Sequence, residues 1–258
     1  MLNNFVLVSL NHDENPINRK ATLFLPNLGI DSIYTNLKIK FSRLKLNVVD
    51  GFLNNFNTKQ IFEKILELNP EAVGFSTTHV NLEDALQISR LLKKINSNII
   101  IIIGGPGSKS LRFKTKGGTI DSIDYCIEGD GEKILEEIVR NGKNQLKTVY
   151  IRSIIKNLDS LEFPSRECFD IEEYIKINTA INSKISTDKE RALNIYTSKG
   201  CDWAKCTYCT ISKNYRVRNP EKIKLELDYL VKIFRINKVF IVDDNFFTFK
   251  NVDRLKYL

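Results

Sequence analysis

The sequence contains no run of about 20 apolar residues, the length that a membrane-spanning helix needs. The apolar stretch near its start has no basic flank, so we expect neither a secretory signal peptide nor a membrane partner. Cysteine is scarce, with five residues among 258, which does not indicate a disulfide scaffold. Thiols in an otherwise ordinary composition favour a reducing compartment, and we predict a cytoplasmic protein.

A long block of charge of one sign is also missing, although Leu193 to Leu258 contains 13 basic against 7 acidic residues and so carries +6 of the net charge. The formal net charge is +8, but basic and acidic residues alternate along the C-terminal quarter, as in the segment 216–228. Such alternation is typical of a solvated helix face, so we expect no nucleic-acid partner, although a basic surface for RNA or a phosphorylated substrate stays open. Hydrophobic residues make up 42% of the chain, enough for a buried core in one or two domains.

Three cysteines near the C-terminal end form the most informative motif. Cys201, Cys206 and Cys209 lie within nine residues, and no histidine or further cysteine follows them. The other two, Cys126 and Cys168, belong to different segments. Thiolates select soft metals, and a structural zinc site is normally closed by four protein ligands. Three thiolates therefore favour an open metal site, while a zinc knuckle lacking one ligand and chance clustering remain alternatives.

The run TSKGCDWAKCTYC resembles the cluster loop of radical S-adenosylmethionine (SAM) enzymes. The resemblance implies that the three cysteines hold a 4Fe-4S cluster, that SAM completes the fourth iron, and that reduction cleaves SAM to a 5′-deoxyadenosyl radical. The usual spacing is three residues and then two. Here it is four and then two, which is similar to members that carry a cobalamin domain. Tyr208 matches the position whose neighbourhood contacts the adenine.

The residues after the cysteines extend this resemblance. YRVRNPEKIKLELDYL predicts a helix with Pro220 near its start, and Lys238 to Val242 predicts a strand that ends in an acidic turn. The order strand, cluster loop, helix, strand and acidic turn is similar to the opening of a radical SAM barrel. By that resemblance Asp243 or Asp244 faces SAM.

The first 142 residues predict strands that alternate with helices, and therefore a doubly wound parallel α/β sheet. The predicted strands are Phe5–Leu10, Asn47–Asp50, Ala72–Ser76, Ile99–Ile103 and Ser122–Ile127, and the predicted helices are Leu28–Leu44, Thr58–Leu68, Asn81–Ile95 and Gly131–Val139. Five consecutive isoleucines indicate a central strand buried on both faces. In the first helix, the apolar spacing predicts an inward face of Ile30, Ile33, Tyr34, Leu37 and Phe41.

Ligands of such sheets bind beyond the carboxyl ends of the strands. The loops there are Ser76-Thr77-Thr78, Gly104-Gly105-Pro106-Gly107 and Glu128-Gly129-Asp130-Gly131-Glu132. Hydroxyls can bond to a ligand, and glycines let it approach the backbone closely. From the residues alone, tight turns and helix caps explain these loops equally well.

The order of LPNLG, NPEAVGFST, IIIGGPGS and CIEGDGEKILEEI resembles the cobalamin-binding domain that precedes many radical SAM barrels, and Asn157 to Tyr174 is similar to the segment that joins the two. The resemblance implies a Rossmann-like domain over 1–145, a linker over 146–192 and the start of a TIM-like barrel over 193–258. By analogy the cobalamin tail is lined by Ser76, Thr78, Gly104, Gly105, Gly129 and Gly131. The Asp-x-His-x-x-Gly loop of some cobalamin enzymes is absent, since the neighbours of His12 do not complete it. We expect His79 to be a partly buried polar residue, and Cys126 a core thiol.

The resemblance implies the N-terminal portion of a radical SAM enzyme with a 4Fe-4S cluster, SAM and, in cobalamin-binding members, cobalamin. Leu193 to Leu258 is far short of the ~250 residues of a full barrel. The expected activity is reductive cleavage of SAM, with C-methylation as one outcome. The expected partners are a small-molecule or peptide substrate and a reductant protein such as flavodoxin or ferredoxin. A truncated, non-catalytic cobalamin-binding module with a vestigial cluster loop, and an iron–sulfur electron carrier, remain alternatives.

Overall fold

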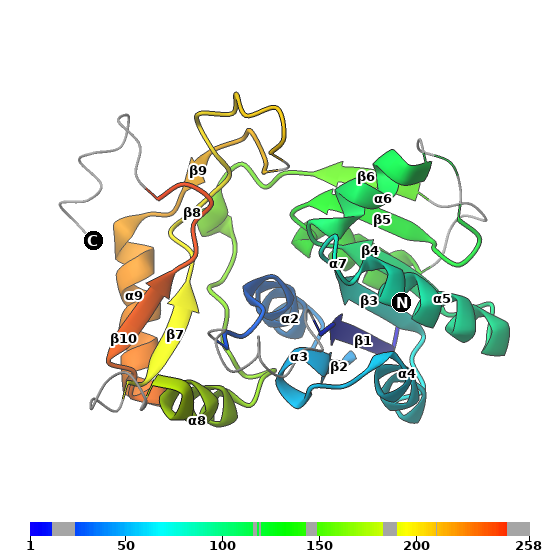
Figure 1. Ribbon diagram of the computed structural model, residues 1–258, viewed down its shortest axis with the longest axis horizontal. Coiled ribbons are helices and arrows are strands. Elements are labelled where there is room, and N and C mark those ends of the chain that lie inside the picture. The colour runs from blue at the N-terminus through cyan, green and yellow to red at the C-terminus, as the bar shows by residue number, and fades with distance from the viewer. Residues whose placement is uncertain are drawn as a thin grey trace. The chain divides into compact units, whose positions relative to one another are not determined.

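The computed structural model describes residues 1–11, 24–115, 118, 120–142, 149–182, 190–209 and 211–246. These residues form two compact units. Unit 1 comprises Met1–Arg19, Gly29–Ser153 and Pro164–Phe169, and unit 2 comprises Lys20–Leu28, Ile154–Phe163 and Asp170–Leu258. Figure 1 shows the elements of both. In the described part of the chain no helix is both long and apolar enough to cross a membrane.

Unit 1 is built on a six-stranded, all-parallel sheet with the order β2-β1-β3-β4-β5-β6. The strands are β1 (Asn4–Ser9), β2 (Lys45–Asp50), β3 (Ala72–Ser76), β4 (Ile100–Gly104), β5 (Tyr125–Gly129) and β6 (Val149–Ser153). The chain moves from β1 to one side to form β2, and the later strands lie on the other side. Parallel neighbours with opposite directions of crossover create a switch point between β1 and β3, where such sheets bind ligands.

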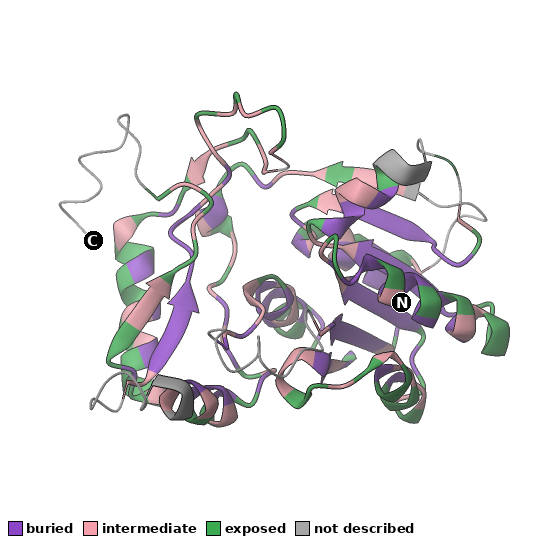
Figure 2. Cartoon of the chain, viewed as in Figure 1, coloured by how far each residue is buried: buried purple, intermediate pink, exposed green. Residues whose placement is uncertain are grey.

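Helices cover both faces of this sheet, because successive residues of its strands point to opposite faces and are nearly all buried. They are α2 (Leu28–Lys40), α3 (Gly51–Asn54), α4 (Thr58–Glu67), α5 (Leu82–Ile95), α6 (Gly107–Thr115) and α7 (Glu132–Asn141). Val6 and Val8 of β1 join a core shared with α4 and α5, whereas Phe5 and Leu7 are equally buried and point to the opposite face. The central strands are therefore buried throughout (Figure 2). The predicted doubly wound sheet is confirmed.

Unit 2 contains a second, smaller parallel pairing. Its elements are η1 (Leu158–Ser160), α8 (Ile171–Asn182), β7 (Ala192–Ile195), β8 (Ser198–Lys199), β9 (Arg216–Val217), α9 (Pro220–Phe234) and β10 (Lys238–Ile241). β7 and β10 pair in parallel, and α9 connects them. Asn219 caps α9 by accepting a bond from the backbone N–H of Glu221, with Pro220 as the first helical residue. The predicted βα opening of a barrel is confirmed.

Two predictions about these elements were incomplete. The sheet does not end near Gly142, because β6 adds a sixth strand within the segment predicted as a linker, and its four residues after Val149 are too few for a periodic signal. The predicted inward face of α2 was partly wrong. Ile33 and Tyr34 are only half-buried, while Asp31, Ser32, Thr35 and Asn36 are buried.

Candidate functional site

The loop with the three cysteines begins and ends at a short antiparallel pairing. Ser198 and Lys199 of β8 pair with Val217 and Arg216 of β9, and the loop spans the residues between them. Gly200 has a φ of +84°, and a Cβ added there would collide with the carbonyl oxygen of a residue across the loop. A side chain is therefore excluded at this position, and the two ends of the loop can lie close together.

The three cysteines are half-buried and form no disulfide. The backbone N–H of Cys209 donates to the carbonyl of Cys206 at 3.4 Å, while the N–H of Cys201 donates to Ser212 across the loop at 2.9 Å. Among the described residues, no three Cys, His, Asp or Glu side chains are close enough to hold a single metal ion. Cysteine thiolates are the ligands by which proteins hold iron–sulfur clusters, and the assignment of these three to a cluster stays a prediction.

The acidic turn after β10 holds the start of this loop in place. Asp243 accepts hydrogen bonds from the backbone N–H and the hydroxyl of Thr197, and from the same two groups of Ser198. Asp244 accepts from the backbone N–H of Gly200 at 2.8 Å. Asn245 donates to the carboxylate of Asp202 at 2.8 Å. The three consecutive side chains therefore bond to three successive parts of the segment 197–202.

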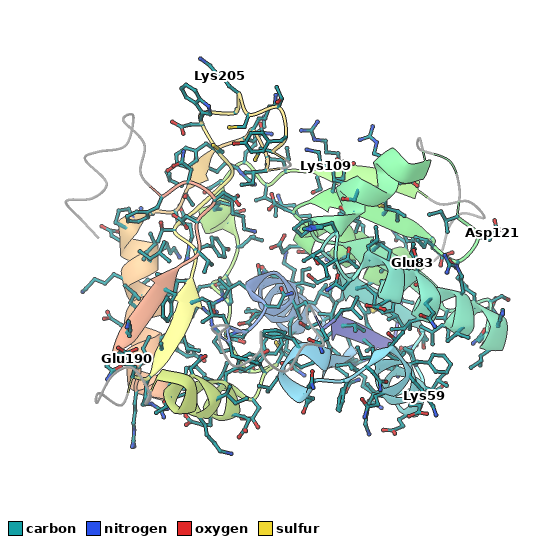
Figure 3. All side chains as sticks on the ribbon, in the orientation of Figure 1. Lys59, Glu83, Lys109, Asp121, Glu190 and Lys205 are labelled. Atoms are coloured by element: carbon teal, nitrogen blue, oxygen red, sulfur yellow. The ribbon has the colours of Figure 1, made fainter. Side chains whose placement is uncertain are left out.

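These contacts bear on the predicted SAM-binding residues. Both carboxylate oxygens of Asp243 are used within the protein, which gives this residue a role in positioning the loop. The contact of Asp243 or Asp244 with SAM stays a prediction. Tyr208, expected near the adenine, is 87% exposed, and Trp203 is 60% exposed. Lys205 lies over the ring of Trp203 and projects from the end of the loop (Figure 3).

A buried arginine that the sequence analysis did not identify as a site residue, Arg218, stabilises the base of the cysteine loop. Arg218 donates to the carbonyl of Tyr196 at 2.8 Å and to the carboxylate of Glu226 in α9 at 2.5 Å. Its backbone N–H donates to Thr197. Arg218 and Glu226 are both buried, so water does not compete for their hydrogen bond. The guanidinium thereby joins the end of β7 to α9 through a charge-assisted hydrogen bond. The one signal in the sequence was the position of Glu226 between Ile223 and Leu230, on the apolar face of α9, where a buried carboxylate needs a basic partner.

In unit 1, the loops after β3 and β4 meet at the edge of the sheet formed by the carboxyl ends of its strands. Ser76 pairs in register with Gly104, so these two predicted residues are neighbours. Thr77 is fully buried, its hydroxyl donates to the Gly104 carbonyl, and a Cβ added at Gly105 would lie 2.5 Å from its carbonyl oxygen. Gly105 is therefore required by the protein's own backbone. At Gly104 an added Cβ would meet one atom, at 3.7 Å, so the space beside it is open to a ligand.

Asn81 links this edge to the end of β1. Its side-chain oxygen accepts from the backbone N–H of Thr78 at 2.7 Å, and its amide donates to the carbonyl of Asn11 at 3.3 Å. His79, expected to be partly buried, is instead exposed, because its neighbour Asn81 takes the inward position. At the next strand end, Gly129 has a φ of +92°, and Gly131 directly precedes α7. Ser76, Thr78, Gly104, Gly105, Gly129 and Gly131 thus lie at strand ends on one edge, and their contact with cobalamin stays a prediction.

Comparison with known proteins agrees with both halves of this description. Residues 15–139 match the family model described as the B12 binding domain. The structure resembles that of the apo, selenomethionine-labelled "cobalamin-dependent S-adenosylmethionine radical enzyme OxsB", with a TM-score of 0.61 and 16% sequence identity over 96% of this chain. By fold and by this domain, the chain is similar to cobalamin-dependent radical SAM enzymes.

Two curated relatives match most of this chain. One, an "uncharacterized methyltransferase" of Pyrococcus horikoshii, is 23% identical over 93% of this chain and 53% of its own length. An "anaerobic magnesium-protoporphyrin IX monomethyl ester cyclase" of Rubrivivax gelatinosus is 23% identical over 76% of this chain and 37% of its own length. The chain spans about half or less of these relatives, and 34% of OxsB.

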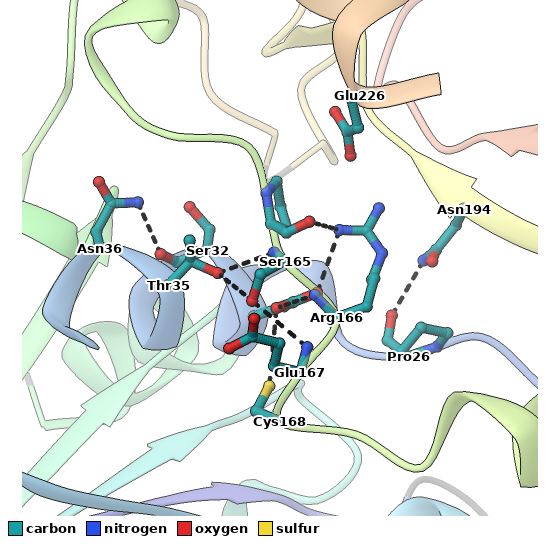
Figure 4. Close-up of polar contacts among 12 residues, drawn as sticks. Pro26, Ser32, Thr35, Asn36, Ser165, Arg166, Glu167, Cys168, Asn194 and Glu226 are labelled. Atoms are coloured by element: carbon teal, nitrogen blue, oxygen red, sulfur yellow. Dashed lines mark hydrogen bonds and ion pairs between the residues drawn. The ribbon is translucent and has the colours of Figure 1, made fainter. Parts of the chain in front are cut away.

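The segment 164–169 contributes a buried polar network to unit 1 (Figure 4). Arg166 is fully buried, and its backbone and guanidinium both donate to Asp31 of α2. Thr35 bonds to Ser165, and burial together with the nearby Asp31 charge raises the pKa of the Cys168 thiol. The segment 164–169 thus explains the burial of Asp31 and Thr35, although it lies 130 or more residues away in sequence. Ser32 instead bonds to Glu132 of α7, and Asn36 bonds to the backbone carbonyl of Ser32.

Proposed function

We propose that this chain is the cofactor-binding N-terminal portion of a radical SAM enzyme, with cluster ligands at Cys201, Cys206 and Cys209. The observation that supports it best is the bonding of residues 243–245 to the start of a loop with three free thiols, in a chain that also contains a B12 binding domain. When bound, the cluster would supply the electron that cleaves SAM to a 5′-deoxyadenosyl radical, and cobalamin would supply a methyl group.

The protein's own residues have positioning roles in this proposal. Asp243 and Arg218 hold the two ends of the cluster loop, so the thiols are presented by a rigid base. In unit 1, the hydroxyls of Ser76 and Thr78 would bond to the cobalamin tail beside the open position at Gly104. C-methylation is the reaction we favour, since a relative that covers 93% of this chain is described as a methyltransferase.

The test is anaerobic reconstitution of the chain with iron and sulfide, followed by addition of SAM and cobalamin. The proposal predicts about four iron atoms per chain, an EPR signal that SAM perturbs, and retention of cobalamin after gel filtration. Retention of cobalamin with iron well below four per chain would favour a non-catalytic cobalamin-binding module. A bound cluster that SAM does not perturb would favour an electron carrier. In the full-length enzyme, consumption of SAM only to 5′-deoxyadenosine would contradict C-methylation.

We also propose that the cluster loop is the docking surface of an acidic reductant protein, such as flavodoxin or ferredoxin. Between residues 199 and 216 the basic residues are Lys199, Lys205, Lys213 and Arg216, against the single acidic Asp202. Attraction between a basic loop and an acidic donor accelerates encounter and weakens with salt. The rate of cluster reduction should therefore fall as ionic strength rises, and Lys205→Glu should lower it further. An unchanged rate would contradict this docking surface.

A further inference from the structure

Asn245 contacts a cysteine that the proposal assigns to the cluster. Its side-chain nitrogen lies 2.8 Å from a carboxylate oxygen of Asp202 and 3.7 Å from the sulfur of Cys201. An ionised carboxylate can only accept hydrogen bonds, so the amide must turn its nitrogen toward Asp202. That nitrogen carries two hydrogens, one for each neighbour. The geometry therefore places an N–H donor on the Cys201 sulfur.

We infer that Asn245 is a positioning residue that raises the reduction potential of the cluster through an N–H···S hydrogen bond to Cys201, an inference that rests on the proposed function. Reduction adds negative charge to the cluster and to its thiolate ligands. A hydrogen bond donated to a ligand sulfur stabilises the more negative, reduced state, and such bonds are among the factors that set the potentials of iron–sulfur clusters. The loss of the donor makes the cluster harder to reduce.

Other contacts of the loop distinguish an electronic role of the Asn245 amide from a purely structural one. Loss of the amide removes the bond from Asn245 to Asp202. The four bonds to Asp243 and the bond from Gly200 to Asp244 also hold the start of the loop, and none of these involves the Asn245 amide. The backbone carbonyl of Asn245 accepts a bond from Ser198, which a change of side chain leaves in place. Removal of the amide should thus leave the loop closed and the thiols in position.

The experiment compares the wild-type chain with Asn245→Ala and Asn245→Asp after anaerobic reconstitution. Asn214→Ala is the matched control, because the Asn214 amide lies in the same loop and contacts Ser212 rather than a cysteine. Iron and sulfide are counted first, and the midpoint potential is then measured by EPR during a redox titration without SAM. Asn245→Ala should shift the potential to more negative values, and Asn245→Asp should shift it further, since a carboxylate replaces the donor. Asn214→Ala should not shift it.

The outcomes distinguish this inference from the proposed function. If the wild-type chain takes up no cluster, the proposed function fails. If the wild type and both variants take up equal iron and have equal potentials, the hydrogen bond has no electronic effect and the inference is overturned. A loss of iron in the isosteric Asn245→Asp variant as well as in Asn245→Ala would also overturn it, because the amide would then be needed to build the loop.

Discussion

Asp243 accepts both hydrogen bonds that Thr197 can donate, one from its backbone N–H and one from its hydroxyl, across 46 residues of sequence. The two residues directly follow paired parallel strands, since Thr197 lies two positions after β7 and Asp243 two positions after β10. The bond therefore joins the carboxyl ends of the two strands at the level where the cluster loop begins. Formation of the loop depends on this strand pairing.

Asp243→Asn should weaken the base of the cluster loop. The amide oxygen could still accept from the two backbone N–H groups, but the amide nitrogen would face the hydroxyls of Thr197 and Ser198, which donate to the carboxylate in the wild type. Those two bonds would be lost or reversed, and charge-assisted hydrogen bonds contribute about 1.5–3 kcal/mol each. We expect the free energy of unfolding of unit 2 to fall by about 2 kcal/mol and the iron content after reconstitution to drop. Chemical denaturation and iron analysis measure the two effects. Asp228→Asn, on the exposed side of α9, is the control and should change neither.

Cys206→Ala should abolish cluster binding without unfolding the sheet of unit 1, because the cysteine loop contributes nothing to that core. The ultraviolet–visible spectrum after reconstitution reports the cluster, and circular dichroism reports the fold. Thr207→Ala, at the adjacent exposed position, should behave like the wild type. Global unfolding of Cys206→Ala would show instead that the cysteines are structural.

Gly105→Ala should destabilise unit 1 more than Gly142→Ala. Both glycines have a positive φ, +77° and +69°, and the ψ of −153° places Gly142 in a region that is almost exclusive to glycine, so backbone strain costs an alanine about 1–3 kcal/mol there. Only at Gly105 would the new Cβ also meet backbone, whereas no described residue lies within 4 Å of it at Gly142. We expect a loss of about 3 kcal/mol for Gly105→Ala in urea denaturation, in line with a strained and crowded site. Equal losses would mean that the loop moves away from Thr77.

Arg166→Met should destabilise unit 1 by about 3–5 kcal/mol, the usual cost of leaving one charge of a buried pair without its partner. The affected group is Asp31, which is fully buried. Burial raises the pKa of its carboxyl, and the Arg166 charge and hydrogen bonds offset that rise only in part. The double variant Asp31→Asn/Arg166→Met should recover part of the loss, as a double-mutant cycle would measure. Additive losses would show that the two side chains do not interact.

The thiols should differ in reactivity toward iodoacetamide in the chain without a cluster. Burial raises the pKa of Cys126 to about 12, and that of Cys168 is also raised by burial, so neither forms the reactive thiolate near pH 8. Cys201, Cys206 and Cys209 are half-exposed and should be modified first, as peptide mass spectrometry would show. Modification of all five in urea is the control, and early labelling of Cys126 would contradict the buried state.

The raised pKa of Cys126 also predicts a dependence of stability on pH. Its value in the folded state, about 12, lies above the value of about 8.5 of an unfolded thiol. The folded state thus holds the proton more tightly, and the stabilisation is complete below pH 8.5 and lost as the pH rises toward 12. Cys126→Ala should flatten this part of the stability profile.

The sequence was sufficient where a pattern is local. The isoleucines of β4 and the start of α9 near Pro220 were predicted, because burial on both faces and a proline in the first helical turn leave signals within a few residues. The polar face of α2 was not, since Asp31 is buried only because Arg166 reaches it. Asn245 was placed in the acidic turn but its contact with Cys201 depends on the pairing of β7 with β10, which periodicity does not reveal.

The assignment of Pro164–Phe169 to unit 1, while the residues on either side belong to unit 2, limits how the gene can be divided. A chain cut after residue 145 would keep Asp31 but lose Arg166, and would also lose β6 from the edge of the sheet. Such a fragment would expose the β5 edge and carry a buried acid without its guanidinium. Expression of unit 1 alone should therefore include residues through Phe169. The segment Pro164–Phe169 follows the last strand of the sheet in sequence, but it is part of the buried interior of unit 1.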